Sequence, residues 1–156
     1  MTNSIERAKY KMIDVKFVKL NKNATTPTQG SEKAAGFDLY ACVSHFVCIE
    51  PHTTEKIPTG LSIQPPEGYF GAIYARSGLA TKEGLRPANC VGCCDEDYTG
   101  EYIVALHNDT DVERYVTSNE RIAQLVFQPY IKTNFVEVEK LDDTNRGSGG
   151  FGSTGK

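Results

Sequence analysis

The segment CVGCCDEDYTGEY, residues 90–102, gathers side chains that could do chemistry: three of the chain's five cysteines, several acids and two tyrosines. Cys90 and Cys93 form a C-x-x-C pair, a spacing typical of zinc sites and of redox-active dithiols. A structural zinc site needs about four ligands, and the sequence offers neither a second C-x-x-C nor histidines at ligand spacing. A redox pair would stand in a βαβ setting, which the pattern lacks. We therefore interpret these thiols as small apolar packing groups.

The acids of the same segment suggest a different chemistry. Asp95, Glu96 and Asp97 lie between two apolar runs and are followed by Tyr98 and Gly100, which predicts a β-hairpin with an acidic tip. A carboxylate at such a tip could act as a general base toward a water molecule. A solvated acidic turn fits this segment equally well.

Two further segments carry groups that suit an anion. Arg76, Ser77 and Gly78 follow an apolar run and precede a short predicted helix around residues 78–83. A guanidinium, a hydroxyl and backbone N–H groups would thus come together, although an ordinary turn explains the same residues. Gln124 is polar within the apolar run RIAQLVF, and it would either satisfy the fold or point at a ligand.

The glycine-rich segment of residues 142–156 predicts a flexible arm, because it cannot form a core by itself. Residues 150–156 match the first positions of a phosphate-binding P-loop, but the strand-and-helix setting of that motif is lacking. Exposed backbone N–H groups and Arg146 still suit phosphate oxygens. Phe151 would have a use in such an arm if it stacked on a nucleobase. A disordered solubilising tail is the alternative.

The elements that position these residues are predicted to be short strands in one domain. Apolar runs recur at roughly ten-residue spacing, separated mostly by Gly, Pro, Asn or Asp, which is typical of an all-β barrel or sandwich. A length of 156 residues suits a single domain. Residues 1–12 are expected to form a loose polar arm. The expected strands cover residues 13–17, 37–43, 45–49, 55–63, 69–75, 101–108, 112–118 and 121–131.

Charge and hydropathy exclude two classes of partner. A net charge of −3 argues against wrapping nucleic acid. No apolar segment approaches membrane-spanning length, and the first residues do not resemble a signal peptide. We therefore expect an intracellular protein without a membrane partner, in the cytoplasm or, for a eukaryotic or viral source, in the nucleus.

Five short motifs, in sequence order, resemble those of the homotrimeric dUTPase family. They are AGFDLYA at residues 35–41, ARSGLA at 75–80, the segment 89–101, ERIAQL at 120–125 and RGSGGFGSTG at 146–155. The resemblance spans residues 13–156. It implies a jelly-roll-like distorted β-barrel assembled as a trimer, with residues 1–141 as the barrel domain and residues 142–156 as a flexible lid over a neighbouring active site.

The resemblance implies hydrolysis of dUTP to dUMP and pyrophosphate, with Mg²⁺ as cofactor. Asp95 would be the general base that activates water toward the α-phosphorus, and Tyr98 would pack against the deoxyribose. The uracil edge would be read by Asn89 and by the main chain near Gly92. Asp38 would hold the magnesium shell through water, while the triphosphate itself binds most of the ion.

The family pattern also assigns residues to the phosphates and to the lid. Phosphate oxygens would be bound by Arg76, Ser77, Gly78 and Gln124. Phe151 would stack on the uracil, and the lid would close over the phosphates through Arg146, Gly152, Ser153 and Thr154. Cys93 and Cys94 depart from the family, which usually has aliphatic residues there.

Two other functions fit parts of the pattern. A dCTP deaminase-like or bifunctional enzyme shares the fold, and a non-catalytic nucleotide sensor could keep it. The Asp95-x-x-Tyr98 spacing and the complete glycine-rich arm favour the hydrolase over the deaminase, and the intact Asp95 argues against the sensor.

Overall fold

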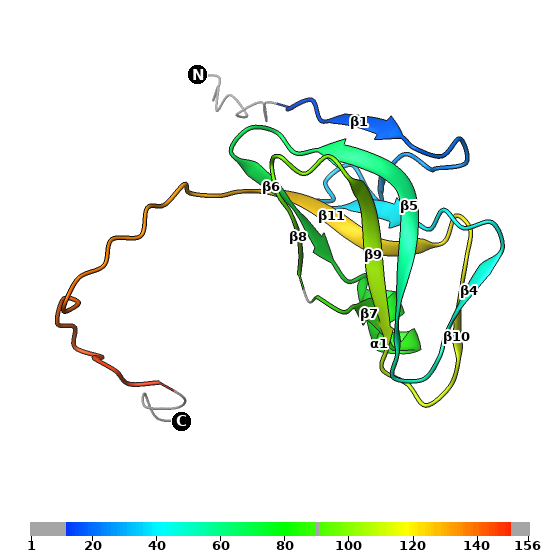
Figure 1. Ribbon diagram of the computed structural model, residues 1–156. Helices are drawn as coiled ribbons and strands as arrows, with labels where there is room; N and C mark the ends of the chain where they lie inside the picture. The colour runs from blue at the N-terminus through cyan, green and yellow to red at the C-terminus, as the bar shows by residue number, and fades with distance from the viewer. Residues whose placement is uncertain (1–11, 90, 151–156) are drawn as a thin grey trace, which may run out of the picture.

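The computed structural model describes residues 12–89 and 91–150, which form an all-β unit with one short helix, as predicted (Figure 1). Every predicted strand has a counterpart, β8 corresponds to the apolar run before the acidic tip, and two short strands were not anticipated: β2 and β7. The strands are β1 (Lys16–Lys19), β2 (Thr28–Gln29), β3 (Phe37–Tyr40), β4 (Phe46–Ile49), β5 (Thr54–Gln64), β6 (Tyr69–Tyr74), β7 (Leu85–Pro87), β8 (Gly92–Cys94), β9 (Glu101–Asn108), β10 (Arg114–Thr117) and β11 (Arg121–Pro129).

The strands form two larger antiparallel sheets and one small one. The orders are β1-β5-β9-β7, β2-β3-β11-β6-β8 and β10-β4. Burial alternates along β9, where Tyr102, Val104 and Leu106 are buried and Ile103 is exposed, as a strand with one core-facing side requires. The core collects such residues from both sheets, including Leu39, Ile57, Leu61, Leu106, Ile122 and Leu125. Each fully buried aliphatic side chain contributes about 1.5–3 kcal/mol.

The hairpin predicted around the acidic tip is wrong. β8 pairs with β6 in the five-stranded sheet, whereas β9 pairs with β5 and β7 in the four-stranded sheet. The acidic turn between them therefore crosses from one sheet to the other. Period-two alternation marks each strand but does not specify its partner, so the sequence pattern could not distinguish a hairpin from a sheet crossing.

The two ends of the barrel also differ from the predicted bounds. The first strand was expected over residues 13–17, but β1 spans Lys16–Lys19, and it pairs with the end of β5. At the other end, β11 stops at Pro129, and residues 130–150 leave the barrel as an extended chain (Figure 1). We call residues 130–150 the exit segment. It begins well before Asp142, where the flexible arm was expected to start.

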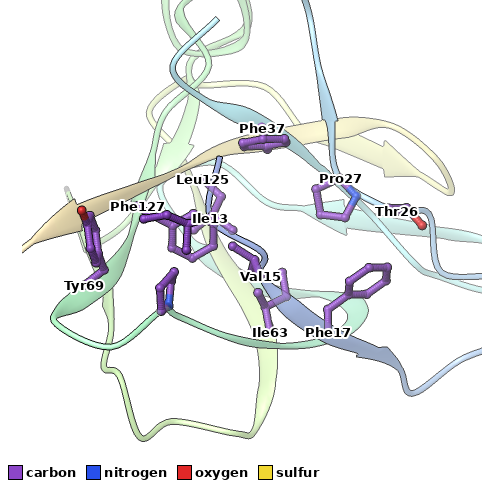
Figure 2. A pocket seen from close by; sticks show the side chains of 11 residues that line it. Ile13, Val15, Phe17, Thr26, Pro27, Phe37, Ile63, Tyr69, Leu125 and Phe127 are labelled. Carbon is purple, nitrogen blue, oxygen red and sulfur yellow. The ribbon is translucent and has the colours of Figure 1, made fainter. Parts of the chain in front are cut away.

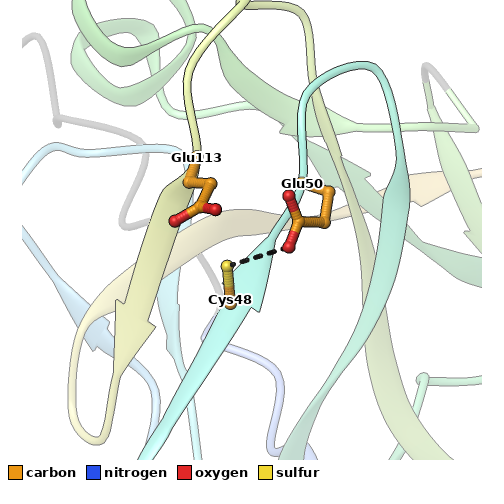
Figure 3. Close-up of side chains that lie close together, drawn as sticks. All are labelled: Cys48, Glu50 and Glu113. Carbon is orange, nitrogen blue, oxygen red and sulfur yellow. Dashed lines mark hydrogen bonds between the residues drawn. The ribbon is translucent and has the colours of Figure 1, made fainter.

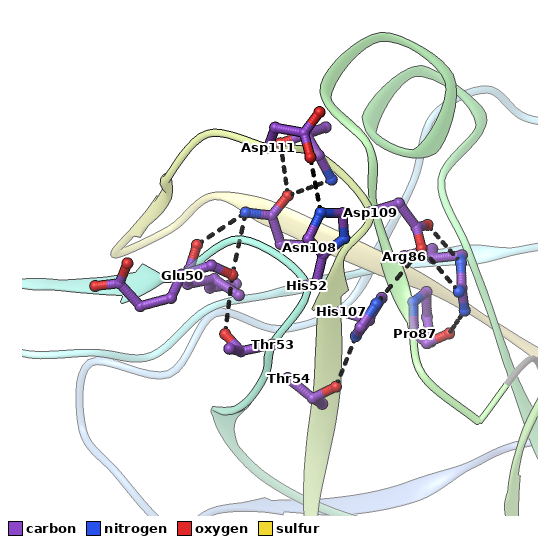
Figure 4. Close-up of polar contacts among 12 residues, drawn as sticks. Glu50, His52, Thr53, Thr54, Arg86, Pro87, His107, Asn108, Asp109 and Asp111 are labelled. Carbon is purple, nitrogen blue, oxygen red and sulfur yellow. Dashed lines mark hydrogen bonds and ion pairs between the residues drawn. The ribbon is translucent and has the colours of Figure 1, made fainter.

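A buried asparagine lies where the loop after β9 meets the end of β4 (Figure 4). The side-chain amide of Asn108 donates to the carbonyls of Ile49, Glu50 and Val112, and its oxygen accepts from the N–H and hydroxyl of Thr110. Because every polar atom of this fully buried side chain has a partner, its burial is compatible with a stable fold. The loop after β9 is thereby fixed to β4.

The predicted helix exists as α1 (Ser77–Glu83). It follows Arg76, whose backbone is extended, and it ends at Gly84 with a φ of 68°. Gly84 suits this left-handed position because a Cβ there would be strained and would clash with Thr110 Cγ2. The helix is therefore held in one place between β6 and β7. None of the helices within the described residues is long and apolar enough to cross a membrane.

Candidate functional site

Four of the predicted site residues meet in one hollow beside the acidic turn. Asn89, Gly92, Asp95 and Tyr98 line a cavity of about 210 Å³, together with Ile73, Cys93, Cys94, Glu101, Tyr102 and Ile103. We call this cavity the turn pocket. Its residues come from β6, β8, β9 and the loops on either side of β8, so both sheets contribute to its walls.

Close packing sets the shape of the turn pocket at Gly92. A Cβ at this position would lie 3.1 Å from Ile73 Cβ and 3.2 Å from Asn89 Nδ2. Any side chain would therefore push the Asn89 amide away from the sheet. Asn89 is exposed and rests on the glycine, which leaves its hydrogen-bonding groups open to a ligand in the pocket.

Tyr98 is held over the turn by a second glycine. A Cβ at Gly100 would approach Tyr98 Oη to 2.5 Å, which is closer than nonbonded atoms come. The Tyr98 hydroxyl donates to the Glu101 carbonyl at 2.9 Å, and the Tyr98 N–H donates to the Asp95 carbonyl at 3.1 Å. The ring is nevertheless 43% exposed. It presents an apolar surface to whatever enters the pocket.

The two thiols beside Asp95 have raised pKa values, which makes them poor nucleophiles. Burial raises the pKa of Cys94 to about 11, so its thiol is protonated at neutral pH. Partial removal from solvent, with the charge of Asp95 adding to it, also raises the pKa of Cys93. The Cys93 thiol donates to Asp95 Oδ1 at 3.7 Å. Cys94 is half-buried, in agreement with its interpretation as a packing group, whereas Cys93 is exposed and does not pack in the core. Cys90 lies outside the described residues.

A second hollow collects the predicted phosphate ligands Arg76 and Gly78 at the start of α1. It measures about 540 Å³ and is also lined by Tyr40, Leu79, Lys82, Glu83, Asn119, Glu120 and Arg121. We call it the arginine pocket. Arg121 belongs to the ERIAQL motif, but the sequence analysis assigned it no role. Its position three residues before Gln124 in that motif could have indicated that it lies near the phosphate ligands.

A buried carboxylate fixes both arginines. Asp38 Oδ1 accepts from Arg76 Nε at 3.0 Å, and Asp38 Oδ2 lies 3.3 Å from an amino nitrogen of Arg121. The Asp38 side chain is 5% exposed, against 25% for Arg76 and 50% for Arg121. A register shift in β11 between Arg121 and Ala123 marks a bulge, a device that re-aims side chains. The pair of guanidiniums thus shares one anion and keeps one net positive charge.

Gln124 lies directly opposite Asp38 on β3 and opposite Tyr74 on β6. Directly opposite residues project from the same face of a sheet, so the side chains of Gln124 and Asp38 leave the sheet on the same side. Within the described residues, no hydrogen bond is recorded for the half-buried Gln124 amide. Ser77 is exposed at the first position of α1.

The remaining predicted ligands belong to the C-terminal part of the chain. Arg146 lies in the exit segment, where its Nε donates to the Gly149 carbonyl at 2.8 Å. Residues 151–156 lie outside the described residues, and with them Phe151, Gly152, Ser153 and Thr154.

Other hollows and clusters are less suited to a charged ligand. One cavity of about 290 Å³ lies between β1, β5 and β11, and its lining is almost wholly apolar (Figure 2). The side chains of Ile13, Val15 and Phe17, which predicted the first strand, line it. Its walls offer no cation or N–H-rich loop for a phosphate.

Among residues 12–89 and 91–150, a single group of three metal-ligating side chains comes together: Cys48, Glu50 and Glu113, on and beside β4 and β10 (Figure 3). The Cys48 thiol donates to Glu50 at 3.8 Å, and its pKa is raised, first by partial removal from solvent. None of the predicted site residues belongs to this group.

The turn pocket and the arginine pocket have no lining residue in common. Ile73, which lines the turn pocket, and Tyr74, which stands beside Gln124, are neighbours on β6. Successive side chains of a strand point to opposite faces. On the five-stranded sheet, Ile73 and Gly92 therefore project from one face, and Asp38 and Gln124 project from the other.

Comparison with known proteins extends this picture. A family model described as dUTPase matches residues 22–155. The deoxyuridine 5′-triphosphate nucleotidohydrolase of Desulfitobacterium hafniense (strain DSM 10664 / DCB-2) is 44% identical over 144 residues, covering 92% of this chain and 95% of that protein. The Staphylococcus bacteriophage 80alpha dUTPase with dUPNHPP has a TM-score of 0.84 at 27% identity, covering 93% of this chain and all of that one.

A variant dUTPase from phage phi11 of S. aureus, in which a structural Mg(II) ion is coordinated, has a TM-score of 0.75 at 22% identity. The match covers 84% of this chain and 100% of that chain. That likeness shows the fold alone. The predicted jelly-roll-like β-fold is confirmed by these likenesses.

Proposed function

Because the chain belongs to the dUTPase family and hydrolyses dUTP, we propose that Asp95 is the general base of this reaction. The observation that carries the proposal is the turn pocket, where Asp95 shares one cavity with Asn89, Gly92 and Tyr98. Asp95 is exposed to solvent, so water can reach its carboxylate, and general bases act through water within hydrogen-bond reach.

In the proposed reaction, the Asp95 carboxylate takes a proton from water, and the water oxygen forms a bond to the α-phosphorus of dUTP. The bond from that phosphorus to its bridging oxygen breaks, and pyrophosphate leaves. The products are dUMP and pyrophosphate. Tyr98 would pack on the deoxyribose, and Asn89 with the main chain at Gly92 would contact the uracil edge.

We assign phosphate binding to the arginine pocket. Arg76 and Gly78 line it, Ser77 begins α1, and Gln124 leaves the sheet on the same side as Asp38. Arg121 joins this set, because the same carboxylate orients it. Planar guanidiniums suit phosphate oxygens, which they can bind through two parallel N–H groups.

Magnesium fits these residues as an ion held chiefly by the substrate. Asp38 already accepts from two guanidiniums, although each carboxylate oxygen retains a further acceptor position for a water molecule. Glu83 and Glu120 also line the arginine pocket, so the pocket is not strongly cationic. When bound, Mg²⁺ would neutralise charge on the triphosphate. Asp38 would then contact the ion through water.

We propose a homotrimer with shared active sites, because the candidate residues of one chain line two pockets that have no residue in common. In a symmetric assembly, the turn pocket of one subunit would meet the arginine pocket of another. The exit segment supports association, because it exposes large apolar side chains: Ile131, Phe135, Val136, Val138 and Leu141. Apolar surface of this extent marks an interaction site. The lid formed by Arg146 and residues 151–154 would close over a neighbouring site.

The Asp95→Asn variant tests the proposed base. Pyrophosphate release from dUTP should fall by about 10²–10⁴-fold, the usual contribution of a general base, while binding of a non-hydrolysable dUTP analogue stays within about threefold. Wild-type turnover in this variant would refute the role of Asp95. Ammonia released from dCTP would instead favour the deaminase-like alternative, which the comparisons do not favour.

A further inference from the structure

Three segments that are distant in the sequence meet at Glu96. Its Oε2 accepts a hydrogen bond from the Gly68 N–H at 2.9 Å and another from the Tyr130 hydroxyl at 2.6 Å. The Tyr130 N–H in turn donates to the Gly68 carbonyl at 3.1 Å. Glu96 belongs to the acidic turn, Gly68 to the β5–β6 turn, and Tyr130 is the first residue of the exit segment. We call these three residues the exit clamp.

The exit clamp is a closed ring of hydrogen bonds. Gly68 uses both its N–H and its carbonyl, and Tyr130 uses both its N–H and its hydroxyl. Gly68 has a φ of 78°, a conformation that L-residues rarely adopt. The ring therefore depends on a glycine at that turn as well as on two side chains.

Asp95 is the immediate neighbour of this ring. Asp95, Glu96, Tyr130 and Lys132 line one hollow of about 560 Å³. The other hydrogen bonds of the acidic turn go to neutral carbonyls or come from a thiol: the Ser62 hydroxyl donates to the Thr99 carbonyl, the Tyr98 N–H and hydroxyl donate to the carbonyls of Asp95 and Glu101, and the Cys93 thiol donates weakly to Asp95 Oδ1. Asp95 itself is exposed. The bonds to Glu96 are thus the strongest recorded ties between this turn and the rest of the barrel, since hydrogen bonds to a charged acceptor exceed those between neutral groups.

We propose that Glu96 and Tyr130 are positioning residues for dUTP hydrolysis, because they hold the Asp95 turn and the root of the exit segment in one fixed relation. The proposal rests on the proposed role of Asp95. A general base must stand within a fraction of an ångström of its productive place. Because two hydrogen bonds anchor Glu96, the acidic turn spends less time in conformations that misplace Asp95 than an unanchored turn would.

Ionisation supports this geometry. The hydrogen bond from Tyr130, followed by that from the Gly68 N–H, holds the pKa of Glu96 below its ordinary value. The same contact raises the pKa of Tyr130. At neutral pH, Glu96 is therefore an ionised acceptor and Tyr130 a protonated donor, the combination that the ring requires.

The test compares four variants of the full-length protein in steady-state dUTP hydrolysis. Tyr130→Phe removes one donor and should lower kcat about fivefold, and Glu96→Ala removes the acceptor and should lower it about twentyfold. In both variants KM stays within about twofold. The double variant should be no slower than Glu96→Ala alone, because the two residues act as one unit. Glu96→Gln keeps an acceptor oxygen and should recover kcat to within about threefold of wild type.

Tyr115→Phe is the matched control. The Tyr115 hydroxyl also donates to a glutamate, Glu113, but Tyr115 lies on β10 and Glu113 directly before it, outside both pockets. Its kcat should equal that of wild type. Titration with a non-hydrolysable dUTP analogue counts the competent sites in every variant, so a loss of folded protein is distinguished from a loss of kcat.

The outcomes separate this proposal from the one on which it rests. Wild-type kcat in Tyr130→Phe and Glu96→Ala, beside an inactive Asp95→Asn, overturns the exit clamp and leaves Asp95 as the base. Additive losses in the double variant, or no recovery in Glu96→Gln, also overturn it. An active Asp95→Asn overturns the proposed base instead, whatever the other variants do.

Discussion

The turn pocket and the arginine pocket are held together by opposite physical means. In the turn pocket, small distances between neutral groups set the shape: Asn89 rests on Gly92, and Tyr98 lies over Gly100. In the arginine pocket, a buried carboxylate between Arg76 and Arg121 sets the position of the charges. The difference teaches that the turn pocket can select a ligand by steric fit. The arginine pocket can bind a ligand by charge and tolerate variation in its shape.

Among the changes that test this comparison, removal of the Asp38 carboxylate from the arginine pocket should have the largest effect on activity. Asp38→Ala leaves two guanidiniums without their acceptor. We expect kcat/KM for dUTP to fall about a hundredfold, because phosphate ligands lose their orientation. Stability should fall by about 1–3 kcal/mol, less than for a fully buried pair because both arginines are partly exposed. Steady-state kinetics and urea unfolding measure the two effects.

Asp109→Ala is the control for this variant. It breaks another Asp–Arg contact, that between Asp109 and Arg86 (Figure 4), outside both pockets. If it lowers kcat/KM as much as Asp38→Ala does, the loss reflects general destabilisation and the contrast between the pockets fails.

A single methyl group should break the turn pocket. The Cβ introduced by Gly100→Ala would stand 2.5 Å from Tyr98 Oη and 2.8 Å from a ring carbon, so the ring must move. We expect KM for dUTP to rise about tenfold, and discrimination against UTP to weaken by a similar factor, because the proposed packing of Tyr98 on the sugar would be lost. Competition kinetics with the two nucleotides provide the measurement.

Gly30→Ala is the matched control, because a Cβ there meets nothing within 4 Å. Unchanged selectivity in Gly100→Ala would show that the position of Tyr98 does not decide the choice of sugar.

The smallest expected effect concerns acid stability of the acidic turn. In the folded protein the pKa of Glu96 is lowered below 4.5, chiefly by the Tyr130 hydroxyl, with the Gly68 N–H and Lys132 adding to the shift. A lowered carboxyl pKa stabilises the fold above the ordinary value, and this contribution is lost as pH falls through the folded pKa. Tyr130→Phe should therefore move the acid-unfolding midpoint slightly upward, as circular dichroism at decreasing pH would reveal. A downward shift would contradict the assignment.

Much of the fold could be predicted because strand periodicity is a local property. Each apolar run from Phe37 to Tyr130 has a strand as its counterpart, and the helix after Arg76 lies where it was expected. Pairing could not be predicted: β8 was expected to pair with β9 and pairs with β6 instead. Short strands such as β7, with three residues, carry too little periodicity to stand out.

The candidate site divides in the same way. The five motifs contained Asp95, Asn89, Gly92 and Tyr98, and the structure brings these four together. The role of Arg121 followed only from its contact with Asp38 across 83 positions of sequence separation. Likewise, nothing in the residues around Glu96 indicates that its partners are Gly68 and Tyr130.

The sequence by itself determined which segments form strands and which residue types are available for dUTP chemistry. These depend on neighbours within a few positions, so the chain encodes them directly. Only the tertiary structure decided that the acidic turn crosses between sheets, that one carboxylate orients two arginines, and that the exit segment is tied to the turn beside Asp95. Such contacts depend on strand register and packing between distant segments, which no local pattern specifies.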